Sequence, residues 1–217
     1  MPMRYAIIII LSMHVLNICA QDNMFIGQLS KRMVVRENYD ENGVFLNKQK
    51  FESGEVENMD GYYEIEVVTE LYDEEEKLTD TYTTTYRCRP KESSIMVMAF
   101  PFAEPKSKKT EINSNSKNFK ELYDLGNLEE IELEISFDSG LLDFFGSKSK
   151  IRIFDRVLES DENAREIKSK INIRTYALGI RIKSFNYEVL EKLTEKDLLS
   201  FQKFTEEDGS YFTMTYK

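Results

Sequence analysis

Strict alternation of apolar and polar residues is the feature that most constrains the fold of this chain. From Glu130 to Asp138 every second residue is apolar, and glutamates, a serine and an aspartate occupy the other positions. The stretch from Tyr63 to Leu71 is similar. A helix would scatter these residues around its circumference, whereas a strand places them on one face. The pattern therefore predicts strands with one buried and one solvated face.

Turn residues separate the predicted strands at short intervals. Asn42-Gly43 is a strong hairpin signal, and the acidic run Asp73–Glu76 and the segment Pro90–Ser93 divide the strands that follow. The order predicts a mainly β fold: an antiparallel meander of about nine or ten strands that forms a strongly curved sheet or incomplete barrel, with one or two short helices.

Several segments depart from simple alternation. The Pro- and Lys-containing stretch 101–116 is predicted to be a surface loop. Helical spacing of apolar residues after a capping threonine predicts a helix over Thr194–Phe204, and a second short helix is expected over Lys117–Tyr123. The apolar register changes within Ile180–Val189, which predicts a bulge near Ser184.

The N-terminus has the layout of a secretory signal peptide. Arg4 precedes an apolar run that begins at Ala6, and the small residue Ala20 suits the cleavage site. Cleavage there leaves residues 21–217 as a single β-rich domain. We expect this domain to be exported, with the periplasm favoured over the cell surface or the medium. No later segment has the roughly 20 apolar residues that a spanning helix needs, so no membrane span is expected in the mature chain.

Cleavage also removes much of the chemistry on which common enzymes depend. His14 is the only histidine, Cys19 is one of two cysteines, and the chain has no tryptophan. Nucleophilic triads need an imidazole base, and typical zinc sites need thiolate or imidazole ligands. We therefore predict a protein that is not an enzyme, with no catalytic residue, metal site or cofactor. The remaining thiol, Cys88, is expected to pack in the core, and the net charge of −10 disfavours nucleic acid as a partner.

Two apolar segments provide the candidate ligand-binding residues. They either fill the core or line a cavity that holds an apolar small molecule, as in barrels that carry a ligand. The candidates are Met96, Met98, Phe100, Phe102, Phe144 and Phe145. The predicted function is thus binding of an apolar small molecule by an exported, soluble protein. One alternative is an interaction or envelope-assembly module that binds another protein through strand edges, and another is a hydrolase that uses paired carboxylates.

The order of these segments resembles a known group. A Tyr39-Asp40-x-x-Gly43 hairpin, a strand ending in Cys88, the apolar segment Ile95–Phe102 and the pair Arg156-Val157 look like the TapB-like exported bacterial β-rich proteins. The resemblance covers roughly residues 30–160. It implies an antiparallel half-barrel or barrel in the cell envelope, and it carries over no catalytic residue.

Overall fold

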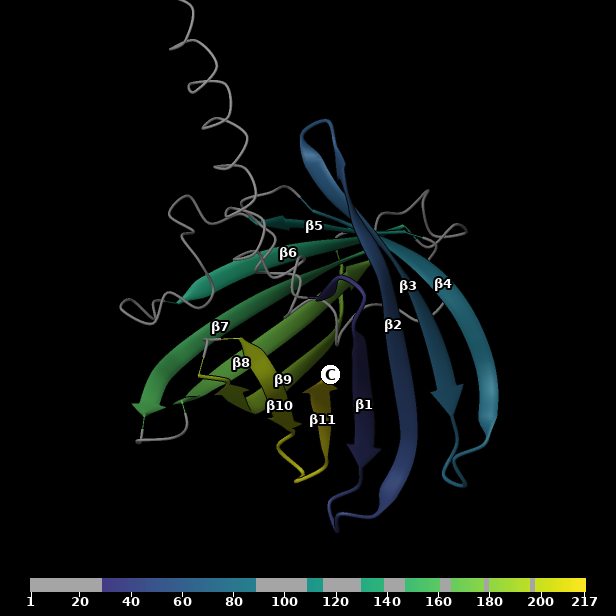
Figure 1. Cartoon of the computed structure of the whole chain (residues 1–217). Coiled ribbons are helices and arrows are strands. Elements are labelled where there is room, and N and C mark those ends of the chain that lie inside the picture. Colours follow the sequence, from purple (N-terminus) through teal and green to yellow (C-terminus); the bar gives the residue numbers. More distant parts are fainter. Residues whose placement is uncertain are drawn as a thin grey trace, which may run out of the picture.

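The computed structural model describes residues 29–88, 109–114, 130–138, 147–160, 165–177, 180–195 and 198–217. These residues form a single type of element, the β-strand, and the described part of the chain contains no helix (Figure 1). The strands are β1 (Met33–Tyr39), β2 (Phe45–Met59), β3 (Tyr62–Tyr72), β4 (Leu78–Cys88), β5 (Lys109–Ser114), β6 (Ile131–Asp138), β7 (Ser147–Ser160), β8 (Arg165–Ala177), β9 (Ile180–Leu193), β10 (Leu199–Thr205) and β11 (Tyr211–Tyr216).

Hydrogen bonds join the strands into one ring. Strands β1 to β4 form one antiparallel meander and β5 to β11 form another, and β11 pairs with β1. The two meanders meet again at a short parallel ladder, in which Thr85–Cys88 of β4 pairs with Lys109–Ile112 of β5. The first half of β4 has ladder pairs with β3 alone. The predicted mainly β, antiparallel and strongly curved fold is confirmed.

The inner face of the ring holds the core. Along β3, β7, β8, β10 and β11, and in the second half of β9, alternate residues point inward and many of them are almost completely buried, as the pleat of a strand requires. On β3, Ile65, Val67 and Thr69 have relative exposures of 1%, 0% and 1%. The core members are mostly branched aliphatic residues and rings, among them Val34, Phe51, Ile151, Ile153, Ile167, Ile171, Val189, Phe204, Phe212 and Met214.

Hydrogen bonds confirm two of the three predicted turns, and the third, Pro90–Ser93, lies outside the described residues. Between β1 and β2, the Asp40 carboxylate accepts the amide of Asn42 at 2.9 Å and that of Val44 at 2.7 Å. Gly43 has a φ of +79°, a region that residues with a Cβ adopt at a cost. Asp73 plays the same part between β3 and β4, where its carboxylate accepts the amide of Lys77 at 2.9 Å.

The helix predicted over Thr194–Phe204 is wrong, because most of this segment belongs to strand β10. Its inward residues Gln202 and Phe204 are fully buried, and the Phe204 ring stacks on Phe212 with 4.5 Å between centroids. Strand partners on both sides override the helical spacing of the sequence. Thr194, expected to cap a helix, instead closes the β9–β10 turn, where its hydroxyl accepts the amide of Leu198 at 3.2 Å.

Other sequence predictions have mixed outcomes. The surface loop expected over 101–116 is wrong for residues 109–114, which form β5. The bulge expected near Ser184 is confirmed, since the β8–β9 register shifts between the pairs Thr175–Lys183 and Tyr176–Arg181. The signal peptide, the second predicted helix and the loop up to residue 108 lie outside the described residues. Within the residues described, no helix is long and apolar enough to cross a membrane.

Candidate functional site

The six predicted ligand-binding residues lie outside the residues that the structure describes. Met96, Met98, Phe100 and Phe102 fall between β4 and β5 in the sequence, and Phe144 and Phe145 fall between β6 and β7. Their assignment to a cavity or to the core stays a prediction. Cys88 is the last residue of β4, and its side chain is also outside the described set.

Part of the inner face carries polar groups. The Arg36 guanidinium lies over the Phe212 ring, 3.9 Å from its centroid, and its Nε donates a hydrogen bond to Asn38 Oδ1 at 2.9 Å. Burial lowers the pKa of Arg36 to about 10, so the group is still charged at neutral pH. Nearby, the Tyr187 hydroxyl donates to Glu206 at 3.3 Å. A buried, stacked and hydrogen-bonded cation of this kind stabilises one arrangement of β1, β9 and β11.

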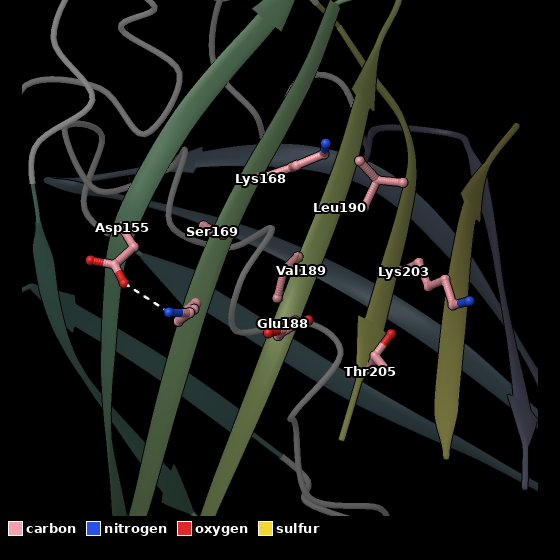
Figure 2. A pocket seen from close by; sticks show the side chains of 9 residues that line it. Asp155, Lys168, Ser169, Glu188, Val189, Leu190, Lys203 and Thr205 are labelled. Atoms are coloured by element: carbon pink, nitrogen blue, oxygen red, sulfur yellow. Dashed lines mark hydrogen bonds and ion pairs between the residues drawn. The ribbon is translucent and has the colours of Figure 1, made fainter. Parts of the chain in front are cut away.

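A groove runs across the outer face of β7, β8, β9 and β10. It consists of two adjoining hollows of about 410 and 430 Å³, which share Lys170, Glu188 and Thr205. Figure 2 shows the first hollow, with Lys168 and Leu190 toward one end and Asp155 and Thr205 toward the other. Volumes of a few hundred Å³ are typical of sites that hold a small ligand or a few peptide side chains.

A β-bulge helps to shape this groove. The register of β7 against β8 shifts between Phe154 and Val157, and Asp155 takes a φ of +52°. The Asp155 carboxylate thereby reaches the Lys170 ammonium on β8 at 3.1 Å (Figure 2). Bulges re-aim side chains in this way and are common beside binding sites.

Beyond the groove, strand β9 has an open edge. It pairs with β10 only from Glu188 to Leu193, because β10 ends at Thr205. Within the described residues, Ile180–Asn186 forms a ladder with β8 alone. This segment also exposes large apolar side chains, since Ile180 is 68% and Ile182 63% accessible. Among the described residues, this edge thus combines a side without a strand partner with exposed apolar surface.

Sequence reasoning did not single out the groove or this edge. Alternation identifies Lys168, Lys170 and Glu188 as outward-facing and gives no reason to separate them from other outward residues. The groove depends on a bulge in β7 and on the short length of β10, which was predicted as a helix. The sequence signal that could have indicated the edge was the change of apolar register between Ile180/Ile182 and the following residues, which was interpreted only as evidence for a bulge.

The described residues contain no cluster of candidate metal ligands. No group of three or more His, Cys, Asp or Glu side chains among them is placed to hold a metal ion. Three of the groove carboxylates have partners: Asp155 pairs with Lys170, Glu206 accepts the Tyr187 hydroxyl, and Glu207 accepts the Asn186 amide.

Comparisons with known proteins give a likeness to several solved structures, including the two below. No family model and no curated protein matches the chain, so the resemblance to the TapB-like proteins stays a prediction. One structure, described as a "putative lipoprotein" of Parabacteroides distasonis, has a TM-score of 0.47 and 14% identity over 89% of this chain and 96% of that one. The other, described as a "putative exported protein with YmcC-like fold" of Bacteroides fragilis, has a TM-score of 0.42 and 9% identity over 86% of this chain and 94% of its own.

Proposed function

We propose that this chain is an exported binding protein that takes up an extended segment of a partner protein along the open edge of β9. The observation that carries the proposal is the edge from Ile180 to Asn186, which exposes two isoleucines and, in the part of the chain that the structure describes, has a ladder on one side only. An added strand would complete its hydrogen bonds, and the partner's apolar side chains would cover Ile180 and Ile182. Export is predicted from residues 1–20.

The charges of the edge indicate the chemistry of the partner. The protein as a whole is acidic, yet Ile180–Tyr187 contains Arg181 and Lys183 and no acidic residue. The Lys183 ammonium lies 4.2 Å from the centroid of the Phe185 ring, which keeps it at the edge. A strand that carries acidic residues among apolar ones would therefore fit best, because its carboxylates would meet Arg181 and Lys183.

The groove continues from this edge and provides room for side chains. Its second hollow is bordered by Asn186 and Tyr187 of β9 and by Glu206 and Glu207 after β10. Asn186 donates to Glu207 at 2.7 Å across the point where β10 ends. A bound segment would thus pass from the open edge to a surface that already carries hydrogen-bonding groups.

The same edge has features that limit indiscriminate pairing. The bulge at Ile182 interrupts the regular ladder, and the two cations would repel a second identical edge. The bulge and the two cations therefore favour a partner of opposite charge over pairing between two copies of this protein.

The test uses a peptide that the chain itself suggests. A synthetic peptide with the sequence from Ile131 to Phe137 alternates apolar residues with two glutamates and a serine, and the matched control peptide has lysine in place of each glutamate. Hydrogen exchange, followed residue by residue, should be fast for the backbone amides of residues 180–186 that point away from β8. Their exchange should become slower when the acidic peptide is added. Absence of protection at saturating peptide would contradict the proposal.

Substitutions distinguish peptide binding at the β9 edge from nonspecific hydrophobic binding. Ile180→Asp and Ile182→Asp should each weaken peptide binding at least tenfold. Val157→Asp is the matched control, because Val157 is also an exposed apolar residue, 54% accessible, but lies on β7. Equal loss in all three variants would count against a site on β9. Size-exclusion chromatography at rising protein concentration shows whether a second copy takes the partner's place.

A second candidate function is the carriage of an apolar small molecule inside the ring. The ring has more strands than the eight-stranded barrels whose inward side chains just fill the interior, and its described wall is largely apolar. Native mass spectrometry of protein purified from its own host tests this candidate. An added mass of a few hundred daltons supports carriage, and a bare chain in repeated preparations argues against it.

A further inference from the structure

A third hollow on the outer face has an unusual arrangement of charges. It has a volume of about 220 Å³ and lies over β6, β7 and β8, away from the groove described above. Its floor is the buried Ile151, and its walls are polar or aromatic. The lining residues are Glu132, Lys150, Ile151, Arg152, Asn172, Arg174 and Tyr176.

Two cations stand directly opposite each other in this hollow. Lys150 of β7 and Arg174 of β8 are register partners, and both side chains are exposed on the outer face. Like charges at directly opposite positions destabilise a sheet. The next strand does not relieve the repulsion on the Arg174 side, because its other register partner is Ser184. Such a conflict with sheet stability is typical of positions selected for binding.

Neighbouring cations on the same sheet are neutralised. Arg152 makes two hydrogen bonds to the Glu130 carboxylate, at 2.5 and 2.7 Å. Lys168 pairs with Glu159 at 2.7 Å, and Lys192 pairs with Glu166 at 2.9 Å. In contrast, in the part of the chain described, no carboxylate lies within ion-pair distance of the Arg174 guanidinium or the Lys150 ammonium. Glu134 is the register partner of Lys150 on β6, but it does not form an ion pair with Lys150.

The remaining groups suit an oxyanion. The Lys150 ammonium lies 5.8 Å from the centroid of the Tyr176 ring, so the Tyr176 side chain borders the space between the cations. A guanidinium offers two parallel N–H donors, an ammonium offers a point charge, and a phenol offers a further O–H donor. The hollow is large enough for a phosphate group and too small for most drug-sized molecules.

We propose that Lys150 and Arg174 form a binding site for a phosphate group, held by the guanidinium on one side and the ammonium on the other. Glu132 lines the hollow and Glu134 lies opposite Lys150 on β6, and their charges restrict the site to a compact anion that fits between the two cations. A phosphate bound there would replace the repulsion between Lys150 and Arg174 by two attractions.

Calorimetric titration at constant ionic strength tests this site. The probes are inorganic phosphate, glycerol phosphate and acetate, with chloride as the background anion. We expect saturable binding of phosphate, at least tenfold weaker binding of acetate, and at least tenfold loss of phosphate affinity in Arg174→Gln and in Lys150→Gln. Binding of glycerol phosphate as tight as that of phosphate indicates that the ligand is a phosphate monoester, and much weaker binding indicates the free ion.

The control variant is Lys192→Gln, which removes the same charge from the same face outside this hollow and outside the groove. Its phosphate affinity should stay within twofold of the unchanged protein. Equal losses in Lys192→Gln and Arg174→Gln would show general attraction to a basic surface, and lack of saturable binding to the unchanged protein would also overturn the proposal. Without phosphate, Arg174→Gln should unfold at a slightly higher temperature, which shows that the variant folds and that the repulsion is real.

Discussion

Gln202 and Glu191 face each other across the β9–β10 ladder, and both are 0% exposed. The Gln202 amide donates to Glu191 Oε1 at 2.7 Å, and its carbonyl accepts the Tyr216 hydroxyl at 2.6 Å. Gln202 thus links β9, β10 and β11 through one side chain. A polar connection of this kind is stabilising only while each member has its partner.

Gln202→Leu should therefore be strongly destabilising. The variant keeps the volume but removes the donor to a buried carboxylate and the acceptor of a buried hydroxyl, which costs about 3 kcal/mol or more. Urea unfolding measures the free energy. Tyr216→Phe, which removes only the last hydrogen bond, is the comparison and should cost about 1 kcal/mol. A Gln202→Leu variant as stable as Tyr216→Phe would show that the amide is not needed.

Gly43→Ala tests the first hairpin. Gly43 has a φ of +79°, and a Cβ there would meet only the Tyr211 hydroxyl oxygen at 3.8 Å, so the cost is backbone strain and not a clash. We expect a loss of about 1–2 kcal/mol. Gly54→Ala is the control, because Gly54 lies in β2 without a positive φ and its Cβ would make ordinary contact at 3.4 Å. Thermal unfolding of both variants should rank them in this order.

Acid should weaken the β10–β11 turn. The Asp208 carboxylate accepts the Ser210 hydroxyl at 2.7 Å and the Ser210 amide at 2.9 Å, and these bonds lower the pKa of Asp208. Because the folded pKa lies below the unfolded one, the stabilisation is present above the ordinary value of about 4 and is lost as the pH falls through the folded pKa. NMR titration of the Asp208 carboxyl measures this pKa directly, and Ser210→Ala should raise it toward the ordinary value.

Alkali should unfold the protein through its tyrosines. Burial raises the pKa of Tyr86, Tyr187 and Tyr216, and burial with a hydrogen bond to Glu37 raises the pKa of Tyr39 to about 12. These groups stabilise the fold while neutral, so stability is full below about pH 10 and falls as the pH rises toward their folded pKa values. Absorbance at an ionisation-sensitive wavelength should show a late group of tyrosines whose ionisation coincides with loss of the β-sheet signal in circular dichroism.

The strands were predictable where local pattern and tertiary environment agree. Alternation in Tyr63–Leu71 and turn chemistry at Asn42-Gly43 act over a few residues, so they were visible in the sequence and are confirmed. The segment Leu199–Thr205 failed for the opposite reason. Its local spacing favours a helix, and only the ladders with β9 and β11 make it a strand.

The candidate sites were less accessible to sequence reasoning. The facing pair Lys150 and Arg174 lies 24 positions apart in sequence, and its register depends on the ladder between β7 and β8. The open edge of β9 exists because β10 stops short of it, a relation between two strand lengths that no single segment contains. Apolar composition, in contrast, pointed to segments outside the residues that the structure describes.

The ladder between β1 and β11 has a consequence for how the protein is made. Val34 pairs with Tyr216, and the backbone amide of Lys217 donates to the carbonyl of Met33 at 2.9 Å. A ribosome synthesises β1 first and β11 last, so the outer side of β1 has no native neighbour until every intervening strand exists. Closure between such distant segments is slow and leaves an unpaired strand exposed meanwhile. A chain built this way benefits from being held extended until synthesis is complete, which is the state in which a polypeptide threads through a translocation channel.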